Sequence, residues 1–174
     1  MATALVSIIC EDHAGLIAGV TGCLYDAGIN LGDTTFAVLG GGAEFTLVAQ
    51  LPERLTLEDL ERDLRSLPDL KGATLTVTPF QYRESHDEHA KITHRIEMVG
   101  DDSPGLVARL SEAFGQFGAN IVRLNSESVP SASGARFLLR MAVWVPADKA
   151  AACMATVANT AGQMNLKCQW QQVG

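Results

Sequence analysis

The hydrophobic pattern along this chain switches repeatedly between the period of a strand and the period of a helix. Thr3–Ile9 is an apolar run that predicts a strand. Gly15–Ala27 carries apolar residues every three or four positions, which predicts an amphipathic helix. By the same criteria the first half continues as strand, strand, helix and strand, at Leu31–Leu39, Ala43–Gln50, Leu55–Leu67 and Ala73–Phe80.

The second half repeats this order of elements. Strands are predicted at Ile92–Val99, Ile121–Val129, Ala135–Val145 and Asn165–Gln171, and helices over 106–117 and Ala147–Ala161. Each half is therefore β-α-β-β-α-β. With right-handed crossovers this order predicts an α+β, ferredoxin-like unit, in which a four-stranded antiparallel sheet has two helices on one face. We expect the second strand to be an edge open for pairing, and the uncovered sheet face to need a cover.

Two segments ninety positions apart have similar sequences. Glu11–Leu31 reads EDHAGLIAGVTGCLYDAGINL, and Asp101–Ile121 reads DDSPGLVARLSEAFGQFGANI. In each, a glycine turn opens the helix, and a second glycine stands where a helix ends. The chain is therefore predicted to be a duplication, with domains at 1–80 and 92–174 and a polar linker at 81–91. Because each half is small, we expect the halves to share burial with each other or with a second copy.

Local signals define several element ends. Gly40–Gly42 and Pro130–Gly134 are predicted hairpin turns, and the second is two residues longer if Phe45 matches Phe137. Thr56 and Asp59 have the spacing of a capping box. In the same helix, two pairs have the spacing of favourable ion pairs, Glu58–Arg62 and Glu61–Arg65.

The charge lies in the first half. Residues 1–80 contain eleven acids and four bases, whereas acids and bases balance in the rest of the chain. Binding to duplex DNA normally requires a basic face that neutralises phosphates, and no basic helix or zinc-finger spacing is present. We therefore expect no direct binding to nucleic acid.

Cysteine usage and hydropathy indicate a soluble, cytoplasmic protein. The four cysteines form no C-x-x-C pair and fall on predicted strands (Cys10, Cys168) or apolar helix faces (Cys23, Cys153). We interpret them as buried thiols in a reducing compartment. No apolar run approaches the roughly 20 residues needed to span a bilayer, and no signal peptide is recognisable.

The two glycine turns are the candidate sites. A helix N-terminus offers unpaired N–H groups that favour a carboxylate or phosphate, and Gly15 and Gly105 remove a side chain that would block its approach. Asp12 and Asp102 could meet an ammonium group, so each turn could hold a free α-amino acid. In the alternative interpretation, Asp12, Asp102 and Ser103 are ordinary N-caps.

Three further polar residues leave two interpretations open. Asn30 and Asn120 either contact a ligand through their side chains or tolerate the backbone geometry after a helix-ending glycine. His13 stands where Ser103 stands in the second repeat, and it either contacts a ligand or faces solvent.

No catalytic constellation is apparent. The histidines (His13, His86, His89, His94) do not recur between the repeats, and no nucleophile-elbow, metalloprotease or P-loop motif occurs. His86 and His89 could bind a metal, but a solvated linker is the better interpretation. We expect no enzyme activity, no cofactor and no metal.

The D-x-x-G-L turn, the helix and the following G-[AI]-N-[IL] resemble the ACT domain, an amino-acid-sensing module of metabolic regulators. The matching residues are Asp12, Gly15, Leu16, Gly28, Ile29, Asn30 and Leu31 in the first half, and Asp102, Gly105, Leu106, Gly118, Ala119, Asn120 and Ile121 in the second. Two such domains with nothing else resemble the glycine cleavage system transcriptional repressor family. His13-Ala14 departs from the Ser103-Pro104 pattern, so we do not expect the two turns to bind a ligand with equal affinity.

The resemblance implies that these motif residues bind an amino acid, with glycine as the expected effector. It also implies action through a partner transcription factor, and side-by-side pairing of domains in a homo-oligomer. Two alternatives remain at this stage: a constitutive protein-interaction adaptor with purely structural turns, or a regulatory subunit of a metabolic enzyme.

Overall fold

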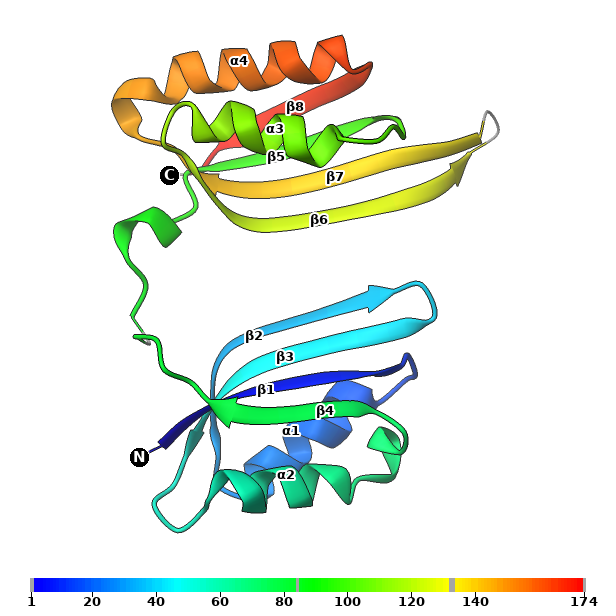
Figure 1. Ribbon diagram of the computed structural model, residues 1–174, viewed down its shortest axis with the longest axis vertical. Helices are drawn as coiled ribbons and strands as arrows, with labels where there is room; N and C mark the ends of the chain where they lie inside the picture. Colours follow the sequence, from blue (N-terminus) through cyan, green and yellow to red (C-terminus); the bar gives the residue numbers. More distant parts are fainter. Residues whose placement is uncertain (1, 84, 132–133, 174) are drawn as a thin grey trace. The chain divides into compact units, whose positions relative to one another are not determined.

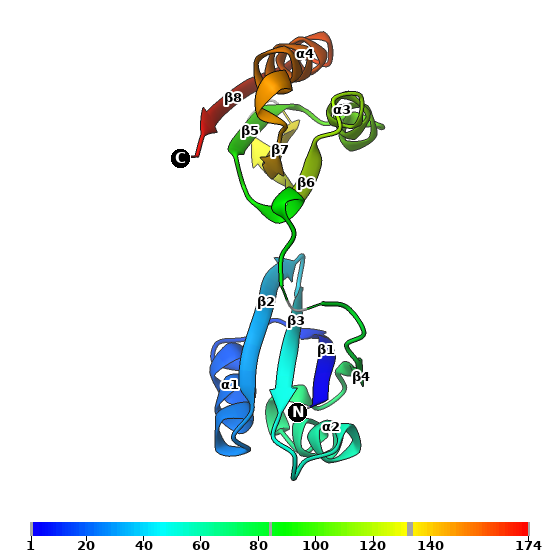
Figure 2. The same cartoon turned by 90° about the vertical axis from the view of Figure 1, so that its left-hand side faces the viewer.

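The chain folds into two units of the same architecture. The computed structural model describes residues 2–83, 85–131 and 134–173, and their contacts divide into Met1–Glu84 and Ser85–Gly174. In each unit an antiparallel four-stranded sheet carries two helices on one face, as two views at right angles show (Figure 1, Figure 2). The predicted ferredoxin-like fold is confirmed in both halves.

The first unit has the strand order β2-β3-β1-β4, with β2 at the edge as predicted. Its elements are β1 (Ala2–Glu11), α1 (Leu16–Asp26), β2 (Asn30–Leu39), β3 (Gly42–Leu51), α2 (Leu57–Arg65), the 3₁₀ turn η1 (Pro68–Leu70) and β4 (Thr74–Pro79).

The second unit has the order β6-β7-β5-β8, so β6 takes the edge position of β2. Its elements are η2 (Glu88–Ala90), β5 (His94–Asp101), α3 (Leu106–Gly115), β6 (Asn120–Ser131), β7 (Gly134–Trp144), η3 (Ala147–Lys149), α4 (Ala150–Gln163) and β8 (Leu166–Gln172). The tip of the predicted Pro130–Gly134 turn, at 132–133, lies outside the described residues.

Each unit has its own hydrophobic core between its sheet and its helices. Alternation along the strands sends every second side chain into this layer, where the helix stripes meet it. The stripe of α1 buries Leu16, Val20 and Leu24, and that of α3 buries Leu106, Leu110, Ala113 and Phe114. The predicted apolar faces are therefore the faces that the fold uses.

The β6–β7 hairpin is longer than predicted. Ile8 pairs with Phe45 in the first sheet, and Met98 pairs with Leu139 in the second. Since Ile8 and Met98 occupy equivalent positions, Phe45 corresponds to Leu139 and not to Phe137. The second hairpin is therefore four residues longer than the first instead of two.

The start of α2 is fixed as predicted, but one ion pair differs. The Asp59 backbone N–H donates to Thr56 Oγ1 at 3.1 Å, and the Thr56 N–H donates to Asp59 Oδ2 at 3.2 Å, which completes the capping box. Arg65 pairs with Glu61 at 2.6 Å. Arg62 pairs with Asp59 at 2.8 Å, because the capping box holds that carboxylate one turn before it, so the predicted Glu58–Arg62 pair is wrong.

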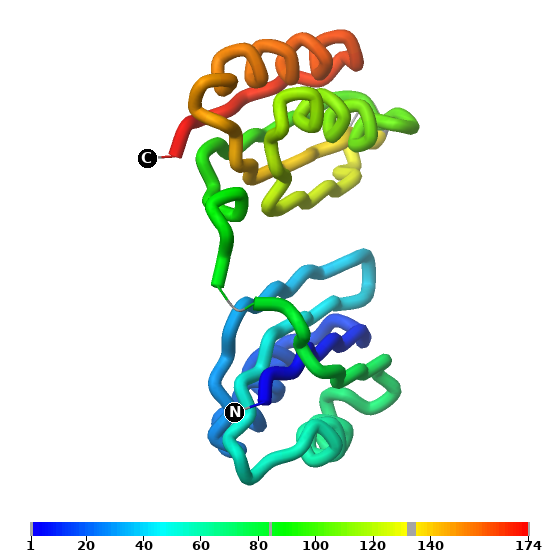
Figure 3. The backbone as a smooth tube through the Cα atoms, turned by 60° about the vertical axis from the view of Figure 1, so that its left-hand side comes forward, coloured from blue at the N-terminus to red at the C-terminus, as the bar shows by residue number. Residues whose placement is uncertain are grey.

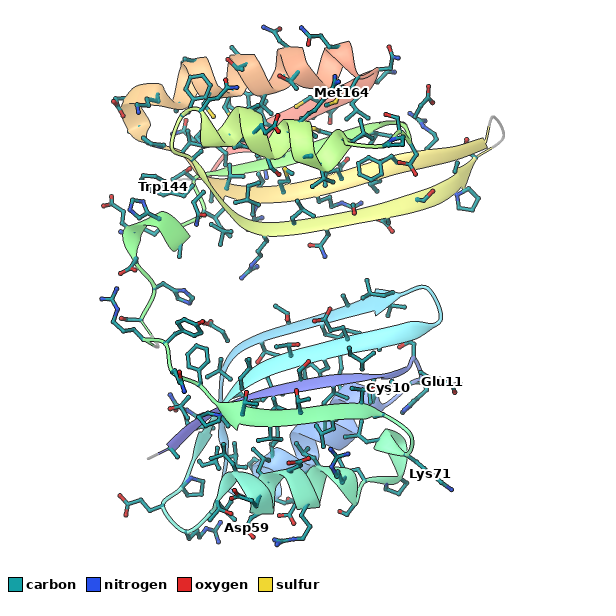
Figure 4. All side chains as sticks on the ribbon, in the orientation of Figure 1. Cys10, Glu11, Asp59, Lys71, Trp144 and Met164 are labelled. Atoms are coloured by element: carbon teal, nitrogen blue, oxygen red, sulfur yellow. The ribbon has the colours of Figure 1, made fainter. Side chains whose placement is uncertain are left out.

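The end of the predicted linker packs against the second unit. Most of 85–91 is exposed, as expected of a linker. The His89 ring nevertheless lies edge-on to Trp144 with centroids 4.4 Å apart, and Asn120 Nδ2 donates to the His89 carbonyl at 2.8 Å. Figure 3 follows the chain through η2 into β5, and Figure 4 labels Trp144 at the end of β7 beside η2. The linker residues nearest β5 thus have fixed contacts.

The cysteines lie on the predicted strands and helices, but only one of the four is fully buried as expected. Cys153 is buried and the other three are partly buried, and all four are free thiols. Burial is the main cause that raises the pKa of each thiol. Among the helices of the described residues, none has the length and apolar character that crossing a bilayer requires.

His94 is a buried residue that the sequence did not single out. It is 3% exposed, its Nδ1 lies 3.0 Å from Thr93 Oγ1, and its ring packs near Trp170. Burial lowers the pKa of His94, because the charged ring would lose its hydration. Its folded-state pKa thus lies below the unfolded value of about 6.5.

We therefore expect the second unit to lose stability as pH falls below about 6.5, because protons then bind the unfolded state in preference. This contribution is fully favourable above that pH. His94→Leu should flatten this part of the dependence of stability on pH. Thr93 Oγ1 keeps its hydrogen bonds to Val143 O and Val145 N–H in that variant. Thermal unfolding of both proteins between pH 5 and 8 measures the difference. An unchanged profile in the variant would assign the pH dependence to other groups.

Candidate functional site

The β1–α1 and β5–α3 turns have the same backbone geometry. Gly15 and Gly105 are the N-cap residues, with φ of 94° and 87° in the left-handed region that favours glycine. Among the described residues, neither helix receives a side-chain cap from Asp12, Asp102 or Ser103. The alternative in which these residues are N-caps is therefore wrong.

The start of each helix is open to a ligand. The N–H groups of Ile17 and Ala18, and of Val107 and Ala108, have no acceptor in the described parts of the chain. No atom lies within 4 Å of a Cβ built on either N-cap glycine. Each turn thus combines free donors, the positive end of a helix dipole and open space, which together favour an anionic group.

His13 closes the first turn against the connection between α2 and β4. Its Nδ1 lies 3.2 Å from the carbonyl oxygen of Ala14, and its Nε2 lies 3.3 Å from that of Asp69. These two acceptors raise the pKa of His13, because only the doubly protonated ring can donate to both. We expected His13 either to contact a ligand or to face solvent. It is exposed, but its ring also contacts the protein backbone, which neither interpretation included.

Acidic groups surround the first turn. A shallow cavity of about 460 Å³ lies beside it, lined by Glu11, His13, Asp69 and Lys71 among others. Figure 4 labels Cys10 and Glu11 at the end of β1, and Lys71 on the connection before β4. The Asp69 carboxylate lies so close to α1 that a Cβ on Gly19 would be 2.5 Å from its Oδ2. A ligand carboxylate would meet like charge here.

The second turn has fewer acidic neighbours. Asp102 and Ser103 are exposed on it, and the residues between α4 and β8, at 163–165, carry no acid in the place of Asp69. Ser103 has no ring with which to repeat the bridge that His13 makes. An anionic ligand would therefore meet less negative charge at the second turn than at the first.

The remaining motif residues divide into buried and exposed positions. Leu16 and Leu106 are 1% and 3% exposed and belong to the cores, so only their backbone can meet a ligand. Leu31 and Ile121 are partly exposed on the edge strands. Asn30 and Asn120 begin these strands, where Asn30 Nδ2 donates to Gln50 Oε1 at 2.9 Å and Asn120 holds the His89 carbonyl. Both amides thus already make bonds within the protein.

No pattern in the sequence indicates the contact between His13 and Asp69. The two residues are 56 positions apart, and Asp69 lies in η1, which carries no motif. In the part of the chain that the structure describes, no three metal-ligating side chains converge, and His89 packs on Trp144 instead. The glycine turns therefore stay the candidate sites for an amino-acid ligand.

Comparison with known proteins identifies the fold family. The model of the ACT domain family matches twice, at residues 2–78 and 95–171. A search of curated proteins found no match to this sequence.

Two solved structures resemble the whole chain. One is an unknown protein from Galdieria sulphuraria, with TM-score 0.77, 19% identity and coverage of 99% of both chains. The other is described as a "putative glycine cleavage system transcriptional repressor", with TM-score 0.67, 15% identity and coverage of 99% of this chain and 97% of that one. At these identities the two structures support the shared tandem fold. Because the family model matches most of both halves, the chain belongs to the ACT domain family.

Proposed function

We propose that this protein is a non-enzymatic regulator that senses a free amino acid. The observation that carries the proposal is the duplicated, uncapped helix start, with free N–H donors and an aspartate three residues before the N-cap glycine. The donors suit the ligand carboxylate, and Asp12 or Asp102 suits its ammonium group. Membership of a family of regulatory modules supports this function over catalysis.

The second turn is proposed as the stronger site. The carboxylate of a ligand bound there would meet the N–H groups of Leu106, Val107 and Ala108. No acidic residue stands at the position that Asp69 occupies in the first unit. Asp102, exposed on the same turn, would receive the ammonium group. In the first unit, the ligand would first have to overcome repulsion from Asp69, which lies over α1.

Glycine is the proposed effector, and a transcription factor the proposed partner. The whole-chain similarity to a protein described as a glycine cleavage system transcriptional repressor supports both. The balanced charge of residues 81–174 suits contact with another protein better than contact with DNA. The exposed edge strand β2, on which Val38 and Leu39 are 51% and 62% exposed, supports pairing with a second copy.

Isothermal titration of the full chain with glycine, serine and a panel of other amino acids tests the function. Acetate and methylamine serve as controls that carry only one of the two charged groups. A bound amino acid at about a hundred times its dissociation constant should stabilise the fold by roughly 2.7 kcal/mol. Absence of both heat and thermal shift with every amino acid would contradict the sensor and leave a constitutive adaptor.

A further inference from the structure

The uncovered face of the second sheet carries a cluster of arginines that the proposed sensor site does not use. Alternation along β5, β6 and β7 places Arg95, Arg123 and Arg140 on this face, while their neighbours Ile96 and Met141 point into the core. All three arginines line one cavity of about 470 Å³. The cavity belongs entirely to the second unit and lies away from the β5–α3 turn.

Two of these arginines are available to a ligand. Arg95 and Arg123 both pair in register with Ala142, one on each side of it, so they flank the smallest side chain of the row. Both are exposed, and neither has an ion pair or hydrogen bond among the described residues. Adjacent strands are about 4.8 Å apart, so the two long side chains can converge above Ala142.

The third arginine is already paired and forms one wall. Arg140 Nε lies 3.1 Å from Glu97 Oε2, and its Nη1 lies 2.9 Å from Glu127 Oε1. These contacts hold Arg140 between two carboxylates, so the three arginines and two glutamates together carry a net charge of +1. Arg95 and Arg123 supply the guanidinium groups that no carboxylate of the described residues contacts directly. The amides of Asn125, Gln169 and Gln171 line the same cavity and add neutral hydrogen-bonding groups.

The first unit does not repeat this cluster. The positions equivalent to Arg95 and Ala142 are Leu5 and Val48, as the matched registers of the two sheets show. The row of strand pairs next to Leu5 holds the hydroxyl side chains of Ser7, Thr46 and Thr76, without an arginine. A chain whose net charge is −7 thus gathers three arginines, two of them unpaired, on one sheet face of one domain.

We propose that this arginine cavity binds a small phosphate monoester. A phosphate monoester carries a charge of about −1.5 to −2 at neutral pH, and each of the two unpaired guanidinium groups can donate two parallel hydrogen bonds to its oxygens. The surrounding amides would bind the polar remainder of the molecule. This site is separate from the amino-acid turn, and a molecule bound there adds a second input to the same domain.

Titration of the full chain with glycerol 3-phosphate at low salt tests the site, with inorganic phosphate and succinate as comparison probes. We expect glycerol 3-phosphate to bind, and Arg95→Leu and Arg123→Leu each to weaken binding by about tenfold or more. Arg95→Leu introduces the residue found at the equivalent position of the first unit, so the fold should tolerate it. Binding should also weaken as salt is raised.

Two further variants distinguish a built site from general attraction to a basic surface. Arg109→Leu removes an exposed arginine from α3, on the helix side, and should leave binding unchanged. Ala142→Val introduces the residue of the first unit between the two arginines and should weaken binding without changing charge. Equal weakening by Arg109→Leu, equal binding of succinate, or no binding of any phosphate probe at millimolar concentration would each overturn the proposal. Glycine binding is measured separately in every variant, so failure of one site does not affect the other.

Discussion

Gly100→Val is expected to unfold the second unit or to lower its unfolding free energy by about 3 kcal/mol or more, as overpacking a tight site does. Gly100 is buried near the end of β5, where the connection from α4 passes over it. A Cβ there would overlap the carbonyl oxygen of Asn165 and would lie 2.8 Å from Leu166 Cδ2. The carbonyl belongs to the backbone and cannot turn away as a flexible side chain would.

The same connection explains why no small adjustment relieves the overlap. Asn165 has φ of 58°, a left-handed conformation that few residues other than glycine and asparagine adopt easily. Leu166, the next residue, is buried in the core and pairs with Gly100 in the ladder between β5 and β8. Moving the carbonyl would therefore disturb both a special backbone turn and a core side chain.

Gly162→Ala is the matched control. Gly162 lies inside α4, where no atom approaches within 4 Å of an added Cβ, so the alanine should stabilise the helix by about 0.5–1 kcal/mol. Chemical denaturation monitored by circular dichroism measures both variants against the parent. A Gly100→Val protein as stable as the parent would mean that the α4–β8 connection approaches β5 less closely than described.

The fold was predictable because its signals are local and occur twice. Alternating residues such as Thr74–Thr78 and stripes such as Leu106–Leu110–Phe114 identify strands and helices without tertiary information. The repeated glycine turn then identified two equal units. Hairpin length was harder, because Phe45 and Phe137 are both aromatic, and only the strand register shows that Leu139 is the true counterpart of Phe45.

The candidate site was predictable in position but not in its surroundings. Gly15 and Gly105 marked the turns correctly, because a left-handed residue before a helix leaves a signature in the sequence. The contact of His13 with Asp69 joins residues from distant elements, and no local pattern reports it. Likewise Arg95 and Arg123 become neighbours only through the pairing of two strands with Ala142. Differences between the two units were therefore less visible than their shared fold.

Gly105→Val is expected to abolish measurable amino-acid binding at the second turn while the domain stays folded. The valine side chain would stand in the open space where a ligand carboxylate must approach the N–H groups of α3. At φ of 87° a β-branched residue costs about 1–3 kcal/mol of backbone strain. A domain stabilised by about 5–15 kcal/mol tolerates this cost.

Gly15→Val is the matched control for this variant, because φ at Gly15 is 94° and the space around it is equally open. The two substitutions carry similar strain, so any difference between them in glycine titration reports the sites and not the fold. If the second turn is the stronger site, Gly105→Val removes most of the binding heat and Gly15→Val removes little. The reverse result would show that Asp69 does not oppose the ligand, and that His13 assists it. Unchanged binding in both folded variants would exclude the turns as the ligand site.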